Sequence, residues 1–193
     1  KRSNMSDWLD LVGSFVIGGL VILMITNFKL SINSAAIQNL HSNVIQRQVV
    51  SSTEVIEHDI YKVGYRINGD VIIEADSNEI RFLSDIDNNG TADEIRYYLT
   101  GTSSMSGSFN PGDRILWRKL NNETNSTPLV ITELNFSYYD SLGQFIDYNM
   151  LNNQSSRNTI KSVKVKIECQ TGELINDKFE KIEWEKTIRP KNI

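Results

Sequence analysis

The chain has 193 residues, of which 39% are hydrophobic and 23% are charged, and its formal net charge is −4. This balance excludes a strongly basic nucleic-acid-binding protein and a highly charged disordered chain. The single cysteine, Cys169, excludes an internal disulfide and a cysteine-rich zinc site, and two histidines leave little material for a histidine metal site. The mean hydropathy of −0.32 is that of a soluble protein, but the apolar residues are unevenly distributed.

An apolar segment near the N-terminus, Leu11–Phe28, contains no charged residue. About 18 to 20 apolar residues at a helical rise of 1.5 Å span a bilayer core, so we expect a membrane-spanning helix within residues 1–29. Lys1 and Arg2 precede the segment and Lys29 follows it. This excess of positive charge on the N-terminal side favours a cytoplasmic N-terminus, with the rest of the chain outside.

Two alternatives to a retained single-pass anchor are open for this segment. In a cleaved signal peptide, the small residues at 34–36 would be the exit site, although they lie far beyond the apolar stretch. In a soluble protein, the segment would be a core helix, which requires that one domain surround a helix that is apolar on all sides. A retained anchor needs neither condition and is the interpretation that the sequence favours.

Small residues and one acid indicate that the membrane segment is a surface on which helices pack. Ser14 and Gly18 are four positions apart, and small residues at this spacing allow helices to approach closely in lipid. Asp10 lies at the edge of the apolar zone, where an acid is costly unless it reaches water or pairs with another group. Hydration and pairing are both open for Asp10. The residues predicted to take part in assembly are Asp10, Gly13, Ser14, Gly18 and Gly19.

The helical pattern continues beyond the membrane segment. Residues 30–66 contain no proline, and apolar residues recur there at spacings of three and four. The pattern predicts an amphipathic extension over 30–66 of one helix that runs from about Asp7 to about Val63, with Gly64 as its C-terminal cap. The apolar positions are Ile37, Leu40, Val44, Ile45, Val49, Thr53, Ile56, Ile60 and Val63.

After Gly64 the period changes from that of a helix to that of a strand. Alternating apolar and polar residues predict an antiparallel β-sheet domain over residues 67–193, with one face in solvent. The alternating segments are 80–83, 95–99, 134–138, 163–169 and 182–188. Polar segments at 101–112, 121–127 and 152–158 predict loops, and Asp140–Gly143 predicts a turn. The expected fold class is α+β, with the long N-terminal helix packed on a meandering antiparallel sheet.

One motif carries the oxygen ligands that a hard cation prefers. Residues 85–93 read DIDNNGTAD, a spacing of oxygen side chains that wraps a chain around calcium, with Gly90 at the tight turn. Arg96 stands where an EF-hand has its last glutamate, so Glu94, a carbonyl or water would complete the shell. A plain hairpin loop is the other interpretation, because turns also favour Asp, Asn and Gly. The candidate ligands are Asp85, Asp87, Asn89, Thr91 and Asp93.

The remaining residues predict no catalytic site. Neither histidine, His41 or His58, lies in the sheet domain, and no glycine-rich phosphate loop follows a strand. Cys169 falls on the apolar phase of its strand, which predicts a buried thiol rather than a reactive one. We therefore expect a protein that is not an enzyme.

Several short motifs follow one another along the chain. They are DIYKVGYR at 59–66, IRF at 80–82, DIDNNG at 85–90, IRYYL at 95–99, ITELNFSYYD at 131–140, IKSVKV at 160–165 and IRPKN at 188–192. Together with the apolar span and the long helix, they resemble the type IV pilin and pseudopilin superfamily, in particular PilW-type minor pilins and GspJ-like pseudopilins. Residues 4–10 contain no glycine of the kind found at the family's processing site, and Asp10 would take the place of the family's glutamate.

The resemblance implies a non-enzymatic minor pilin or pseudopilin of a bacterial type IV pilus or type II secretion-like filament. Such a subunit would sit in the inner membrane or in an extracellular filament, assemble with other pilin-like subunits through its N-terminal helix, and display the sheet domain. The alternative function is a membrane-anchored, calcium-dependent adhesive or sensing domain that does not polymerise.

Overall fold

The computed structural model describes residues 3–101, 109–121, 129–172, 174 and 178–193, without the side chains at positions 3–7, 41 and 48. Most of the loop residues predicted at 101–112 and 121–127 lie outside these ranges. The chain begins with helix α1 (Ser3–Tyr61). The elements that follow are β1 (Ile72–Ala75), β2 (Glu79–Ser84), β3 (Asp93–Leu99), β4 (Arg114–Leu120), β5 (Leu129–Ile131), β6 (Glu133–Tyr139), the 3-10 helix η2 (Tyr148–Asn152), α2 (Gln154–Arg157), β7 (Ser162–Gln170) and β8 (Lys181–Ile188).

The chain divides into two compact units, Lys1–Asn43 and Val44–Ile193. All described residues of the first unit belong to α1, and their large apolar side chains are exposed, as at Phe15 (73%) and Met24 (72%). Helix α1 continues without a break into the second unit, which confirms the predicted helical extension of the apolar segment. It begins and ends slightly before the positions that the sequence predicted.

The second unit contains two antiparallel sheets rather than one. Strands β1 to β5 form a meander in which each strand pairs with the next along the chain, and β6, β7 and β8 form a separate three-stranded sheet. The five alternating segments found in the sequence correspond to β2, β3, β6, β7 and β8. Strands β1, β4 and β5 were not predicted, because β1 and β5 are short and β4, which reads RILWRKL, does not alternate between apolar and polar residues.

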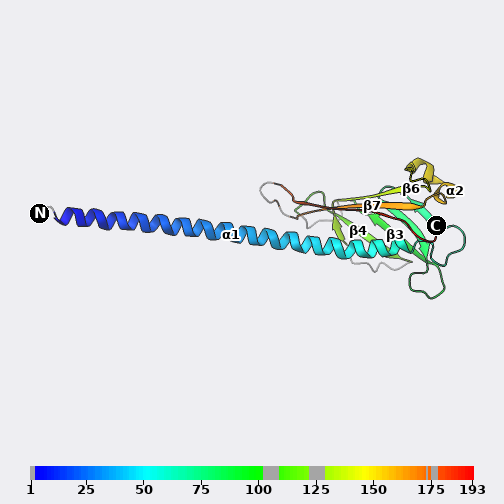
Figure 1. Ribbon diagram of the computed structural model, residues 1–193, viewed down its shortest axis with the longest axis horizontal. Helices are drawn as coiled ribbons and strands as arrows, with labels where there is room; N and C mark the ends of the chain where they lie inside the picture. Colours follow the sequence, from blue (N-terminus) through cyan, green and yellow to red (C-terminus); the bar gives the residue numbers. More distant parts are fainter. Residues whose placement is uncertain (1–2, 102–108, 122–128, 173, 175–177) are drawn as a thin grey trace. The chain divides into compact units, whose positions relative to one another are not determined.

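The C-terminal part of α1 packs on the sheets through one apolar stripe, which confirms the α+β class. Figure 1 shows this part of the helix beside β3 and β4. Burying an Ile or Val side chain in such a stripe stabilises the fold by roughly 1.5–3 kcal/mol. Of the predicted apolar positions, Ile37, Leu40 and Val44 are exposed instead. The buried positions of the stripe are Val49, Thr53, Ile56, Ile60 and Val63, and they join a core that includes Ile80, Phe82, Ile95, Phe136 and Val165.

A buried ionic cluster lies within this stripe. The carboxylate of Asp59, whose residue is 1% exposed, accepts hydrogen bonds from the hydroxyl of Tyr97 at 2.7 Å and from Nε of Arg118 at 2.6 Å. Burial lowers the pKa of the Arg118 guanidinium, but the hydrogen bond and charge of Asp59 outweigh burial, and the pKa is raised overall. Burial, followed by the Asp59 charge, raises the pKa of Tyr97 well above its ordinary value. The cluster therefore joins α1 to β3 through Tyr97 and to β4 through Arg118.

The end of α1 is held by strand β2 rather than by a simple helix cap. Gly64 has a left-handed conformation (φ 76°), as expected of a cap, but its N–H donates to the carbonyl of Leu83 at 3.0 Å. A Cβ at this position would lie 3.1 Å from the carbonyl oxygen of Asn192. Glycine is thus required both by the backbone conformation and by the close approach of the C-terminal segment.

The segment 152–158, predicted as a loop, instead contains the short helix α2. Its N-terminus is capped by Asn153, whose side-chain oxygen accepts from the N–H of Ser156 at 2.8 Å. The capping capacity of Asn explains why a run of polar residues forms a helical turn here. The turn predicted at Asp140–Gly143 is present, and the Asp140 carboxylate accepts from the N–H of Leu142 at 2.8 Å.

We expect Arg118→Ala to lower the free energy of unfolding by about 3 kcal/mol, because it leaves the buried Asp59 carboxylate without its cationic partner. Chemical denaturation of the full chain in detergent, followed by tryptophan fluorescence, measures the change. Arg96→Ala on the neighbouring strand is the matched control. It removes an arginine that pairs with Glu79 at a more exposed site, and we expect a loss of at most about 1 kcal/mol. Equal losses in the two variants would contradict a special role for the buried cluster.

The thiol of Cys169 is 2% exposed, which confirms the buried position predicted from the sequence. Burial raises its pKa to about 12, with smaller contributions from the charges of Asp113 and Glu168. Because the thiolate is the reactive species, we expect an aromatic disulfide reagent at pH 8 to label the folded chain at least about a hundredfold more slowly than the unfolded chain. Rapid labelling under native conditions would show that the strand opens.

Candidate functional site

The acidic motif forms the hairpin between β2 and β3. The two strands meet at the pair Ser84 and Asp93, so the loop begins at Asp85 and closes where β3 starts. Asn88 and Gly90 have left-handed backbone conformations, with φ of 62° and 87°. The chain therefore reverses direction within the motif, as both the calcium interpretation and the hairpin interpretation require.

The loop brings three of the predicted ligands together. One carboxylate oxygen from each of Asp85, Asp87 and Asp93 lies within 4.8 Å of the others. Asp85 and Asp93 are buried, whereas Asp87 is exposed at the mouth of the cluster. This arrangement places negative charge at one point of the hairpin, with one side open to solvent.

The two buried carboxylates are held by backbone amides of the same loop. Oδ2 of Asp85 accepts from the N–H of Gly90 at 3.2 Å, and Oδ2 of Asp93 accepts from the N–H of Ile86 at 3.1 Å. Asp93 also receives a hydrogen bond at its other oxygen from the side-chain amide of Asn121, at 2.8 Å. Asn121, in the turn after β4, was not predicted, because its contact with the motif depends on the pairing of β3 with β4.

The other two predicted ligands, Asn89 and Thr91, are exposed. Asn89 contacts Asp87, and Thr91 contacts Asn89. The side-chain N–H of Asn89 donates to Asp87 at 2.7 Å, and its oxygen accepts from the backbone N–H and the hydroxyl of Thr91. They therefore orient Asp87 in this structure. Glu94, one of the groups expected to complete a shell, faces the opposite side of β3, where it lies 3.8 Å from Arg81.

An arginine that the sequence analysis did not single out borders the cluster. Arg66 donates to Oδ2 of Asp85 at 3.2 Å, and this hydrogen bond, with the nearby charges, raises the pKa of the guanidinium. The ammonium of Lys62 donates to the carbonyl of Ile86 at 2.8 Å, and the hydroxyl of Ser84 donates to the carbonyl of Lys62 at 2.7 Å. These contacts anchor the acidic loop to residues 62–66, which directly follow α1.

The predicted assembly residues lie in the apolar part of α1. The helical period places Asp10, Ser14 and Gly18 along one side, with Gly13 beside them and Gly19 on the opposite side from Asp10. The hydroxyl of Ser14 donates to the carbonyl of Asp10 at 2.8 Å. A Cβ added at any of the three glycines meets nothing within 4 Å, so packing among the residues that the structure describes does not require glycine there. By length and composition, α1 is able to cross a membrane.

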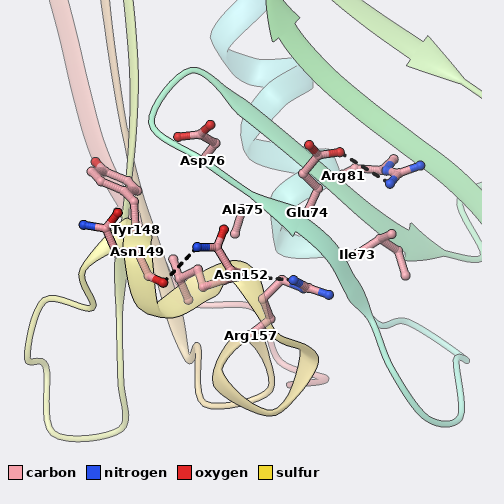
Figure 2. Close-up of a pocket in the computed structure, with 10 residues that line it drawn as sticks. Ile73, Glu74, Ala75, Asp76, Arg81, Tyr148, Asn149, Asn152 and Arg157 are labelled. Carbon is pink, nitrogen blue, oxygen red and sulfur yellow. Dashed lines mark hydrogen bonds and ion pairs between the residues drawn. The ribbon is translucent and has the colours of Figure 1, made fainter.

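A polar pocket of about 390 Å³ lies between β1 and the segment that contains η2 and α2. Figure 2 shows Glu74 paired with Arg81 on one side and Arg157 on the other. The guanidinium of Arg157 donates hydrogen bonds to the carbonyls of Ile72 and Leu151, at 3.2 and 2.8 Å. Residues far apart in the sequence form this pocket, so no local motif could have predicted it.

Comparison with known proteins leaves function to be argued from the chain itself. The chain matches no family model, no curated protein and no solved structure among those with which it was compared. Two features therefore carry the functional argument: the exposed apolar stretch of α1, and the acidic loop anchored near the end of the same helix.

Because Gly90 has a positive φ and donates its N–H to Asp85, we expect Gly90→Ala to lower the free energy of unfolding by about 1 kcal/mol. Gly172→Ala is the matched control, since a Cβ there also meets nothing within 4 Å but the backbone is not left-handed. Denaturation of the full chain in detergent measures both variants. A Gly90→Ala variant as stable as Gly172→Ala would show that the loop relaxes into another conformation.

Proposed function

We propose that this chain is a non-enzymatic pilin-like subunit, a minor pilin or pseudopilin, of a bacterial type IV pilus or type II secretion-like filament. The observation that carries the proposal is the apolar stretch of α1, whose large apolar side chains are exposed. It continues as the same helix into a stripe that is buried against the sheets. Such a helix fits a subunit that is anchored in lipid or among other helices and that displays a folded head.

The apolar stretch of α1 requires an apolar environment that the described residues do not supply. Phe15 and Ile22, which are 73% and 66% exposed, lie on one side of the helix, and Met24, which is 72% exposed, lies on the opposite side. A helix that is apolar on all sides is stable in a bilayer or in a bundle of similar helices. Both environments are available to a subunit that resides in the inner membrane and is then taken up into a filament.

The small residues of the same stretch support lateral assembly with other pilin-like subunits. Gly13, Ser14 and Gly18 carry small side chains or none, and among the described residues nothing lies within 4 Å of a Cβ built at either glycine. Close approach of backbones at small residues is a general route of helix association in lipid. Asp10, one turn before Ser14, is placed to pair with a neighbouring subunit or to remain hydrated at the membrane surface.

A non-enzymatic role agrees with the state of the scarce reactive side chains. Cys169 is buried with a raised thiol pKa, and the ring of His58 lies at the surface beside Asp59, at 3.5 Å. The side chain of His41 lies outside the described residues. The proposal therefore assigns the work of the protein to assembly and display.

The proposal predicts that the chain appears in sheared surface filaments or detergent-extracted filament complexes of the bacterium that produces it. Gly18→Leu should reduce its recovery with other pilin-like subunits at least about tenfold, because the added side chain separates the helices. The variant remains apolar, so it should stay in the membrane fraction with a folded head, as judged by resistance to protease.

Val16→Leu, on the opposite side of the helix from Gly18, is the matched control and should assemble normally. Unchanged recovery of Gly18→Leu with other subunits would overturn assembly through this face. A chain found only as a monomer in the membrane would instead favour the rival function, a calcium-dependent adhesive or sensing domain that does not polymerise.

A further inference from the structure

One oxygen of the buried Asp85 carboxylate has no hydrogen-bond donor among the described residues. Asp85 is fully buried, and its Oδ2 is satisfied by Arg66 and by the N–H of Gly90. Its Oδ1 is also buried, and no partner is found for it. Buried carboxylate oxygens are almost always paired, because desolvation without a donor is costly. A cation beside Oδ1 would remove this cost.

The spacing of the surrounding carboxylates fits a single ion. Oxygens on opposite sides of a calcium ion, each at 2.3–2.6 Å, are about 5 Å apart. The carboxylate oxygens contributed by Asp85, Asp87 and Asp93 lie within 4.8 Å of one another, so they can touch one ion of this size without unfolding the hairpin. The ligand type is oxygen throughout, which suits a hard cation and not zinc or copper.

The charge of the cluster also leaves room for a divalent ion. Three carboxylates meet one guanidinium, that of Arg66, whose side chain is half exposed. The nearby ammonium of Lys62 is directed to the carbonyl of Ile86 instead. A divalent cation would neutralise the two negative charges that Arg66 leaves.

We propose that the loop Asp85–Asp93 binds one calcium ion through carboxylate oxygens of Asp85, Asp87 and Asp93. Backbone carbonyls and water would fill the remaining positions, since Glu94 faces away and the oxygen of Asn89 is bound to Thr91. Calcium is favoured over magnesium because it accepts a flexible set of oxygen ligands, whereas magnesium demands near-ideal octahedral geometry and keeps its water.

Calorimetric titration of calcium into the full chain, in detergent and after treatment with a chelator, tests the site. We expect one ion per chain, with a dissociation constant of about 10⁻⁴–10⁻³ M, and a higher thermal unfolding midpoint in calcium than in chelator. Titration with magnesium under the same conditions should give weaker binding. Absence of heat and of any thermal shift at about 10 mM calcium would overturn the proposal, and magnesium binding as tight as calcium would overturn the choice of ion.

Two variants that each remove one negative charge separate a site from general attraction to an acidic surface. Asp87→Asn changes an exposed side chain and keeps an oxygen for the N–H of Asn89, so the hairpin should stay folded while calcium affinity falls at least about tenfold. Glu133→Gln, an exposed acid on β6, should bind calcium as the unaltered chain does. Equal affinity of Asp87→Asn and the unaltered chain, or equal weakening in both variants, would contradict the proposed site.

The calcium proposal does not depend on filament assembly. The titration uses separate chains in detergent, so a chain that never polymerises can still bind the ion, and an assembled subunit can fail to bind it. Failure of one proposal is thus distinguishable from failure of the other.

Discussion

The structure depends on one constraint: a single helix has to be stable in two different environments. Along its first part, α1 is apolar on every side, and nothing within the described chain covers it. Along its last part, only a stripe is apolar, and that stripe is buried in the core of the second unit. A sequence average conceals this division, because the polar sheets balance the apolar helix. The near-soluble mean hydropathy of −0.32 is therefore a mean over two kinds of surface.

Within the buried stripe, specificity comes from polar contacts as well as from apolar packing. Apolar burial is non-directional, so an apolar stripe alone does not fix the position of a helix along a sheet. Asp59 has its partners, Tyr97 and Arg118, at one position on β3 and β4, and a shift would leave a buried charge unpaired. The ionic cluster therefore sets the register of the helix on the sheet. The end of the helix is held separately, by the N–H of Gly64, which donates to the carbonyl of Leu83 on β2.

The sequence predicted those features that depend on local periodicity, and it missed those that depend on contacts between distant residues. The helix and the strongly alternating strands were predictable, whereas β1 and β5 are too short to show a period. The three aspartates of the loop were found because a turn brings them together. Asn121 was not found because the pairing of β3 with β4 places it beside the loop. Arg66 was not found because a long-range contact brings the segment after α1 to the loop, where the N–H of Asp85 donates to the carbonyl of Tyr65. Strand alternation also explains why Glu94, next to Asp93 in sequence, faces the other side of the sheet.

The two proposals meet at the end of α1. The acidic loop is tied to this point by Lys62, Ser84 and Arg66, so a ligand that favours the folded loop also favours the folded junction between helix and sheet. Calcium bound at the loop would strengthen this junction as the occupancy of the site rises. The stability of the second unit would then depend on the calcium concentration by mass action, without any movement of the helix.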